Sequence, residues 1–301
     1  MKQFLFVIGL LSIGISINAQ PCAPIVAPQF SENTRNEFEQ KLSAAKADYQ
    51  KDTTNADAII WYGRRTAYIG EYMKAIEIFT IGINSHPGDA RLYRHRGHRY
   101  ITVRCFDKAI ADFKKAAQLI KGKADEMEPD GLPNAKNIPT STLQSNIWYH
   151  LGLCYFIKGE YKNAVKVYKK GLIVSKHPDM YVATANWMNL ALRELKKYKE
   201  AGELYNSIDL NAELIESRDY MNILEMYRHK STEKEIESYA TMIADKNKTV
   251  ASATVNFGIG YYCLLFGYRQ KAIEYFNKAI ATNQWSSFGY IAAETELRKM
   301  K

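Results

Sequence analysis

The stretch that decides the fold is IIWYGRRTAYIGEYMKAIEIFTIGINSHP (residues 59–87), because its pattern recurs in RLYRHRGHRYITVRCFDKAIADFKKAAQLI (residues 91–120). Matched positions in the two copies share one constant offset along the chain: Gly63/Gly97, Tyr72/Phe106, Ala75/Ala109 and Phe79/Phe113. A third copy, IWYHLGLCYFIKGEYKNAVKVYKKGLIVSKHP (residues 147–178), carries Gly152, Tyr161, Ala164 and Tyr168 in the same order. Repetition at a fixed period indicates similar structural units stacked in a row.

Each unit contains two amphipathic stretches, in which apolar residues recur three and four positions apart, as one face of an α-helix requires. A short turn joins the two stretches, at Gly70 in the first unit, Arg104 in the second and Gly159 in the third. One helix pair cannot bury its own apolar face, so neighbouring pairs must stack on each other. We therefore expect an all-α fold.

These repeats resemble the tetratricopeptide repeat (TPR) family, in which each unit is a helix pair of about 34 residues. The resemblance implies a TPR-type α-solenoid, a right-handed superhelix of helix pairs, over a single unit from residue 31 to residue 301. Flanking cap helices are expected at residues 34–51 and 285–300. The repeats are expected at about residues 56–89, 90–121, 145–178, 182–210, 212–246 and 252–283.

Capping boxes, in which Ser or Thr is followed three residues later by Glu or Gln, predict where some helices begin. Thr34 with Glu37 predicts the start of the first cap helix. Ser141 with Gln144 predicts the start of the third unit, and Thr232 with Glu235 a helix in the fifth.

Residues 1–19 have the layout of a secretory signal peptide, with Lys2, an apolar stretch at residues 4–17 and Ala19 at the expected cleavage point. We therefore expect an exported protein, periplasmic or secreted, that begins with an extended segment at residues 20–30. Pro21 precedes Cys22, where a lipoprotein signal needs a small side chain, so a lipid anchor on Cys22 is not expected. The rest of the sequence has no apolar run long enough to span a membrane.

Composition excludes some classes of function. The net charge of +9 is spread along the chain with acidic residues interleaved, which indicates a solvated surface and no nucleic-acid partner. Four cysteines, at positions 22, 105, 154 and 263, are too few and too scattered for a disulfide framework, and Cys154 and Cys263 are expected to be buried thiols. No cofactor or metal is expected.

The resemblance also implies which residues bind a partner. In TPR proteins the first helix of each pair lines a concave groove, and its positions correspond here to Ile60, Arg64, Tyr68, Arg91, Arg94, His98, Asn146, Tyr149 and Leu153. Such a basic and aromatic surface suits an acidic or carboxylate-bearing protein or peptide. We therefore predict a non-enzymatic binding scaffold whose partner-binding groove contains Arg64, Tyr68, Arg91, Arg94, His98, Asn146 and Tyr149.

An insertion at residues 122–140 separates the second and third units, because Gly97 and Gly152 lie much further apart along the chain than Gly63 and Gly97 do. Long loops in regular arrays are often functional, although a tolerated surface insertion is equally compatible with the sequence. Arg96 occupies a position that usually holds a packed apolar residue, and an unpaired charge there would be costly. We hypothesise that Arg96 binds Glu126, Glu128 or Asp130 and so folds the insertion over the groove.

The sequence leaves two other classes open. A hydrolase or metal-dependent enzyme would need His95, His98 and His150 to converge with the acidic loop at residues 126–130, although no catalytic motif is present. A subunit of a larger envelope assembly is the other alternative.

Overall fold

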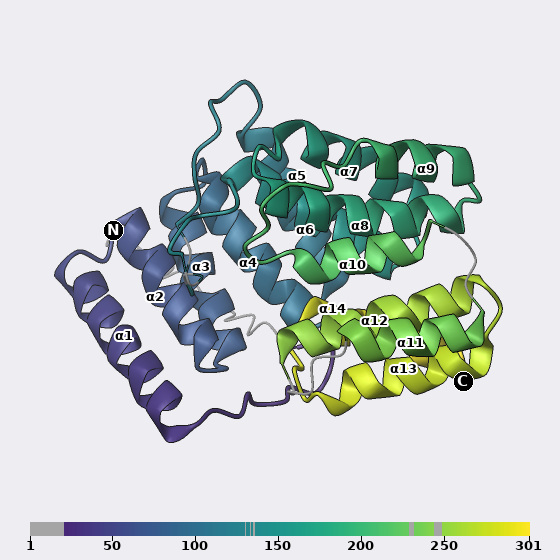
Figure 1. Cartoon of the computed structure of the whole chain (residues 1–301). Coiled ribbons are helices and arrows are strands. Elements are labelled where there is room, and N and C mark those ends of the chain that lie inside the picture. The colour runs from purple at the N-terminus through teal and green to yellow at the C-terminus, as the bar shows by residue number, and fades with distance from the viewer. Residues whose placement is uncertain (1–20, 130, 133, 135, 229–231, 244–248) are drawn as a thin grey trace, which may run out of the picture.

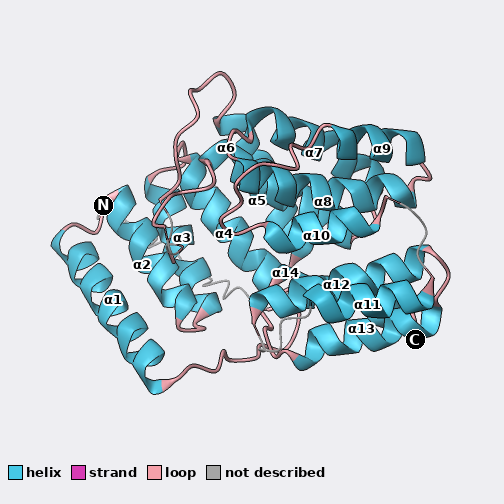
Figure 2. Ribbon diagram, viewed as in Figure 1, coloured by secondary structure: helices cyan, strands magenta, loops and turns pink. Residues whose placement is uncertain are grey.

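A computed structural model describes residues 21–129, 131–132, 134, 136–228, 232–243 and 249–301. The predicted signal peptide, residues 1–19, lies outside the described residues. Helices make up most of the described chain (Figure 2), which confirms the all-α prediction. The helices are α1 (Glu32–Lys51), α2 (Ala56–Tyr68), α3 (Tyr72–Ser85), α4 (Ala90–Thr102), α5 (Phe106–Leu119), α6 (Leu143–Ile157), α7 (Tyr161–Val174), α8 (Pro178–Glu194), α9 (Tyr198–Asn206), α10 (Arg218–Met226), α11 (Glu233–Ile243), α12 (Val250–Leu265), α13 (Arg269–Ala281) and α14 (Phe288–Lys299).

The helices form two rows. The first helices of successive pairs pack on one another in the order α2, α4, α6, α8, α10 and α12, and α14 packs on α12 at the end of this inner row. The second helices, α3, α5, α7, α9, α11 and α13, each contact the first helix of their own pair and form the outer row. Figure 1 shows this array curving so that α14 lies near the end of α4. The fold is the expected TPR-type solenoid.

A glycine facing an aromatic ring sets the close approach within four of the helix pairs. A Cβ atom added to Gly63 would lie 2.5 Å from the Phe79 ring, and one added to Gly152 would lie 2.3 Å from the Tyr168 ring. Gly97 with Phe113, and Gly260 with Phe276, repeat the arrangement. Each ring is fully buried, so a methyl group at these glycines would force the two helices apart.

Two of the three predicted capping boxes are wrong by a few residues. Ser31 caps α1, its hydroxyl accepting from the Thr34 amide at 3.2 Å, whereas Glu37 pairs with Lys41 one turn later. Thr142 and Ser145 form the box at the start of α6. The third box is confirmed, because the Thr232 hydroxyl accepts from the Glu235 amide and the Glu235 carboxylate accepts from the Thr232 amide.

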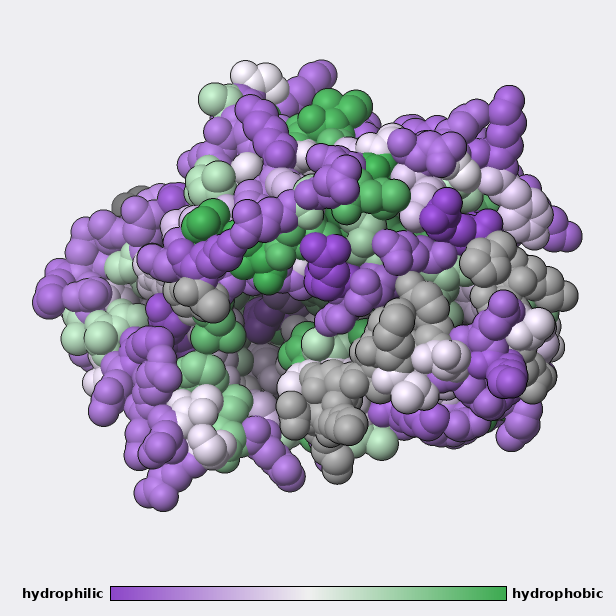
Figure 3. Space-filling view, in the orientation of Figure 1, coloured by the Kyte–Doolittle hydropathy of each residue, from purple (hydrophilic) through white to green (hydrophobic). Residues whose placement is uncertain are grey.

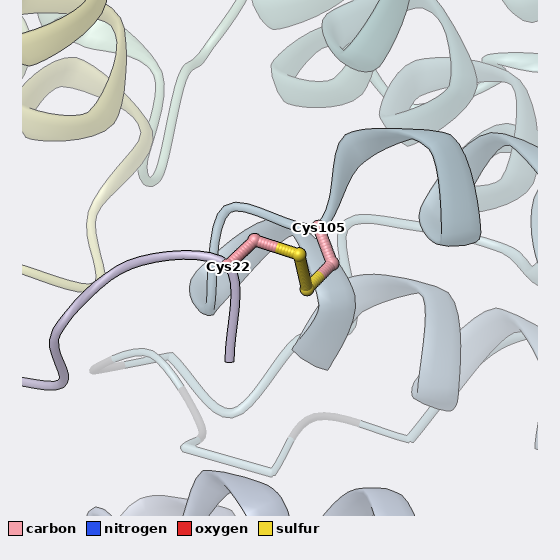
Figure 4. Close-up of a disulfide and its surroundings, with 2 residues drawn as sticks. All are labelled: Cys22 and Cys105. Carbon is pink, nitrogen blue, oxygen red and sulfur yellow. A yellow bond between two sulfur atoms is a disulfide. The ribbon is translucent and has the colours of Figure 1, made fainter. Parts of the chain in front are cut away.

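Residues 22–30 form an extended strap that crosses the turns of the first two helix pairs. A disulfide joins Cys22 to Cys105 at the start of α5, with 5.1 Å between their Cα atoms (Figure 4). Pro28 packs against Gly70, whose φ of +93° and lack of a side chain allow this contact. The cysteine pattern excluded a disulfide framework and did not predict this single bond, because 83 residues separate the two cysteines and only the folded array brings them together. Cys154 and Cys263 are buried and form no disulfide, as expected.

Arg104 joins the second helix pair to the cap helix α14 and to the loop that precedes it. It lies in the α4–α5 turn at a φ of 62°, where the first, third and sixth units have Gly70, Gly159 and Gly267. A left-handed conformation costs a non-glycine residue about 1–2 kcal/mol. The Arg104 guanidinium donates to the Trp285 carbonyl at 2.9 Å and to Glu294 at 3.0 Å, and it stacks 3.8 Å from the centre of the Trp285 ring. These contacts close the curved array on itself.

None of the helices in the described part of the chain is both long enough and apolar enough to cross a membrane.

Replacing both Cys22 and Cys105 by Ser should lower the free energy of unfolding by roughly 2–4 kcal/mol, because the disulfide restricts the unfolded chain over a long loop. Urea denaturation of the oxidised protein and of the double variant measures the difference. A reducing agent should destabilise the parent protein by a similar amount and leave the variant unchanged. Equal stability of the two oxidised proteins would contradict the predicted role of the bond.

Candidate partner-binding site

The arginines of α4 lie at the centre of the predicted groove, and most of them are bound by carboxylates of the same chain. The Arg91 side chain contacts Asp89, which caps α4, at 2.6 Å, and Asp57 at the start of α2, also at 2.6 Å. These two hydrogen-bonded carboxylates raise the pKa of Arg91. Arg91 therefore joins the first two helix pairs and has little of its hydrogen-bonding capacity left for a partner.

Arg94 binds the insertion. Its guanidinium lies 2.9 Å from one oxygen of Glu128, and both side chains are about nine-tenths buried. Asn146, another predicted groove residue, donates from its side-chain amide to the other Glu128 oxygen at 3.2 Å and to the Ser141 hydroxyl at 2.9 Å. Burial lowers the pKa of Arg94, and the attraction of Glu128 opposes that effect. Two predicted groove residues thus hold one carboxylate in a buried clamp.

The segment around Glu128 runs across the first helices of the array. Arg64 and Arg65 of α2 each donate at 2.8 Å to a backbone carbonyl of the insertion, at Pro129 and Gly131 respectively. Gly131 lies against Arg64 and Tyr68 so closely that an added Cβ atom would lie 1.7 Å from the Tyr68 hydroxyl.

The two ends of the insertion also meet. Met127 and Thr142 form an antiparallel bridge, so the chain leaving the second unit pairs with the chain entering the third. Thr140 donates to Glu216 at 2.6 Å, well beyond the third unit. The insertion does fold over the groove, as hypothesised.

The hypothesis that Arg96 anchors the insertion is wrong. Arg96 forms two parallel hydrogen bonds with Asp112 of α5, at 2.7 and 2.8 Å, and donates to Thr80 of α3 at 3.1 Å. Glu126 is exposed, and Asp130 lies outside the described residues.

The position of Asp112 explains the error. In the first, third and sixth units, the pairs equivalent to Arg96 and Asp112 are apolar and buried: Tyr62/Ile78, Leu151/Val167 and Ile259/Tyr275. The second unit replaces one such apolar pair by a buried ion pair between its own two helices. Arg96 and Asp112 directly precede Gly97 and Phe113, and this matched spacing is the sequence signal that would have found the pair.

The histidines of the alternative enzyme interpretation lie near each other without forming a metal site. The rings of His98 and His150 are 4.7 Å apart between their centres, and His95 stacks on Phe79. The Arg94 guanidinium lies 3.2 Å from the Nδ1 atom of His95 and 3.4 Å from that of His98. A cation of the protein therefore already lies between these two histidines. Among the described residues, no group of three or more His, Cys, Asp or Glu could hold a metal ion.

Three other predicted groove positions are part of the core. Ile60 and Leu153 are buried between helices. The Tyr149 hydroxyl accepts from the Trp187 indole at 2.9 Å and lies 3.3 Å from the Tyr220 hydroxyl, so this side chain connects the third unit to the fourth and fifth. Burial raises the pKa of Tyr149.

A cavity of about 650 Å³ lies beside the covered groove, between the α2–α4 part of the array and the α12–α14 part. The molecular surface is hollowed at this place (Figure 3). Two predicted groove residues, Tyr68 and His98, line the cavity, together with the strap, α1 and the loop between α13 and α14. Sequence reasoning missed the strap and the loop because they lie outside the repeats.

Arg99 is the charged residue in this cavity. Asp, Glu and Lys are absent from the described residues that line the cavity, and the Arg99 guanidinium has no hydrogen-bond or ion-pair partner among the described residues. Burial lowers its pKa to about 10, so the guanidinium is still charged at neutral pH. Burial also lowers the pKa of the neighbouring His98 well below its usual value, so this histidine adds no positive charge.

The comparisons with known proteins agree with the repeats. A family model described as tetratricopeptide repeat matches residues 145–172 and 253–284. No curated protein sequence matches the chain.

Among solved structures, one described as MamA is 19% identical, with a TM-score of 0.43, over 60% of this chain and 97% of that chain. YrrB, described as a TPR protein with an unusual peptide-binding site, is 13% identical, with a TM-score of 0.43, over 84% and 99% of the two chains. Such distant likenesses carry no argument about a ligand.

The fold defines a helical-repeat array. The glycine–aromatic pairs and the two rows of helices are those of a TPR-type solenoid, and the family model identifies tetratricopeptide repeats at residues 145–172 and 253–284.

Acidification should destabilise the protein, because burial lowers the pKa values of His95 and His150 well below the usual value. Unfolded histidines titrate near pH 6.5, so below that pH the unfolded chain binds more protons than the native protein. Stability is therefore full above about pH 7.5 and falls as the pH drops through 6.5, by up to about 1.4 kcal/mol per pH unit for each histidine. Thermal melting between pH 8 and pH 5 measures this slope. A His150→Gln variant should show a shallower slope, and an unchanged slope would contradict the prediction.

Proposed function

We propose that this protein acts outside the cytoplasm as a non-enzymatic scaffold that binds an acidic, extended segment of another protein on its concave face. The observation that carries the proposal is the clamp on Glu128, in which Arg94 and Asn146 hold a carboxylate inside the groove. A surface that binds one extended acidic segment of its own chain has the chemistry to bind a similar segment of a partner.

The partner segment would take the place of residues 126–131. Its carboxylate would pair with Arg94, and Arg64 and Arg65 would donate to its backbone carbonyls, as they do to those of Pro129 and Gly131. Charge-assisted hydrogen bonds of this kind are worth about 1.5–3 kcal/mol each. Since the insertion and the partner make the same contacts, the partner has to compete with a segment of the same chain, which is present at a high effective concentration.

Two further arginines of α4 argue against a nucleic-acid partner. Arg91 and Arg96 are paired with Asp89, Asp57 and Asp112 of the same chain, so the basic cluster in the sequence is not a free basic surface. Phosphate binding would need these guanidinium groups to be unpaired.

Action outside the cytoplasm is supported by two features. Residues 1–19 have the layout of a signal peptide. The disulfide between Cys22 and Cys105 is of the kind that persists in an oxidising compartment. A lipid on Cys22 would need the sulfur that this bond uses.

Export can be tested by fractionating cells that express the full chain. The protein should be recovered from the periplasm or the medium. Its mass should match a chain that begins near Gln20, and Cys22 should be oxidised. The Cys22→Ser variant is the matched control, because it should still be exported. Recovery of the uncleaved chain from the cytoplasm would contradict the proposal.

Acidic-segment binding can be tested with the peptide ADEMEPDG, which copies residues 124–131, in a fluorescence polarisation assay. The Glu128→Gln variant should bind the peptide at least tenfold more tightly than the parent protein, because its own insertion competes less well. Arg94→Gln should lose this binding, and the peptide with Gln in place of its third acidic residue should bind weakly.

Arg91→Gln is the matched control on the same helix, because Arg91 does not contact the insertion. It should leave peptide binding unchanged. Limited proteolysis at Lys121, Lys123 and Lys136 should be faster in Glu128→Gln and Arg94→Gln than in this control. Equal peptide binding by the Arg94 and Arg91 variants would overturn the proposed groove.

A further inference from the structure

The cavity beside the groove has the features of a second, separate binding site. Its walls come from the strap, α1, the ends of α2 and α4, and the loop between α13 and α14, so most of it lies outside the groove formed by the repeats. We propose that this cavity binds a small molecule with one carboxylate and an apolar or aromatic body, and that Arg99 holds the carboxylate.

The charge of the cavity selects a single anionic group. Arg99 supplies one positive charge, and the lining residues that the structure describes add no Asp, Glu or Lys. A guanidinium taken out of water without a counter-ion is costly to the folded protein. A carboxylate matches it in charge and can accept two parallel hydrogen bonds from its planar fork. A dianionic phosphate would bring a second charge with no partner.

The other walls of the cavity determine which uncharged part of a ligand fits. Six aromatic side chains line the cavity: Phe30, Phe38, Tyr68, Tyr72, Trp285 and Phe288. Neutral polar groups from Thr34, His98 and residues 282–287 make up much of the rest. Rings on several sides of one cation form a site for an apolar or aromatic group that ends in a charge.

The size and rigidity of the cavity favour a small molecule over a polypeptide. A volume of about 650 Å³ is within the range of about 300–1,000 Å³ that is typical of small-molecule sites. Two of its walls are fixed by contacts already described, since the disulfide holds the strap and Arg104 holds Trp285. The site is therefore formed before the ligand arrives, which reduces the entropy lost on binding.

Isothermal titration calorimetry of the oxidised mature protein tests the proposal, with 3-phenylpropionate and octanoate as probes. Both acids should bind, and 3-phenylpropionamide, which has the same shape without the charge, should bind at least tenfold more weakly. The Arg99→Gln variant should lose at least tenfold in affinity for the acids. Its melting temperature should not fall, because the Arg99 guanidinium has no partner among the described residues.

Arg91→Gln is the matched control, since it removes an arginine from the same helix that does not line the cavity, and it should bind the acids as the parent does. Phe288→Ala is a second variant, which removes part of the apolar wall and leaves Arg99 in place. It should weaken the binding of both acids.

Three results would overturn the inference. They are equal binding of the acid and the amide, unchanged acid binding by Arg99→Gln, and binding of a peptide that ends in Phe when neither free acid binds. Binding of the peptide ADEMEPDG to the groove should be unaffected by Arg99→Gln, so failure of this site and failure of the proposed scaffold function are distinguishable.

Discussion

The contact of a glycine on one helix with an aromatic ring on the next is the constraint on which the array depends. It recurs at Gly63/Phe79, Gly97/Phe113, Gly152/Tyr168 and Gly260/Phe276, always with the same separation along the chain. The fourth unit has Asn189 and Tyr205 at this spacing, and there one side-chain atom of each is buried without a hydrogen-bond partner. That unit also has a second helix, α9, of only nine residues. Loss of the glycine therefore accompanies a less regular pair.

The repeated part of the fold could be predicted from the sequence because the same pattern of packing residues recurs in several units. The contacts that close the structure could not, since each occurs once and joins distant residues. The cysteines of the disulfide are 83 residues apart, and Arg104 and Glu294 are 190 residues apart. Arg104 does carry a local signal, because it stands at a turn position where three other units have glycine.

The same distinction applies to the residues of the predicted groove. Three of the positions that the family resemblance implies, Arg64, Arg94 and Asn146, contact the insertion. The choice of Arg96 as the anchor failed because two residues along a helix turn the side chain through about 200°, toward α5 and away from the groove. The cavity around Arg99 was not predicted, because three of its walls belong to segments that carry no repeat pattern.

The bond network of Arg104 has a consequence for how the molecule comes apart. In an open solenoid each unit is stabilised by its neighbours alone, and the terminal units fray first. Here the last helix and the loop before it are bound to the second helix pair, and the strap ties the chain's beginning to the same turn. Neither end of the array is therefore expected to fray independently, because opening at one end also breaks contacts of the other. An array that is linear along the sequence thus acquires the cooperativity of a globular domain.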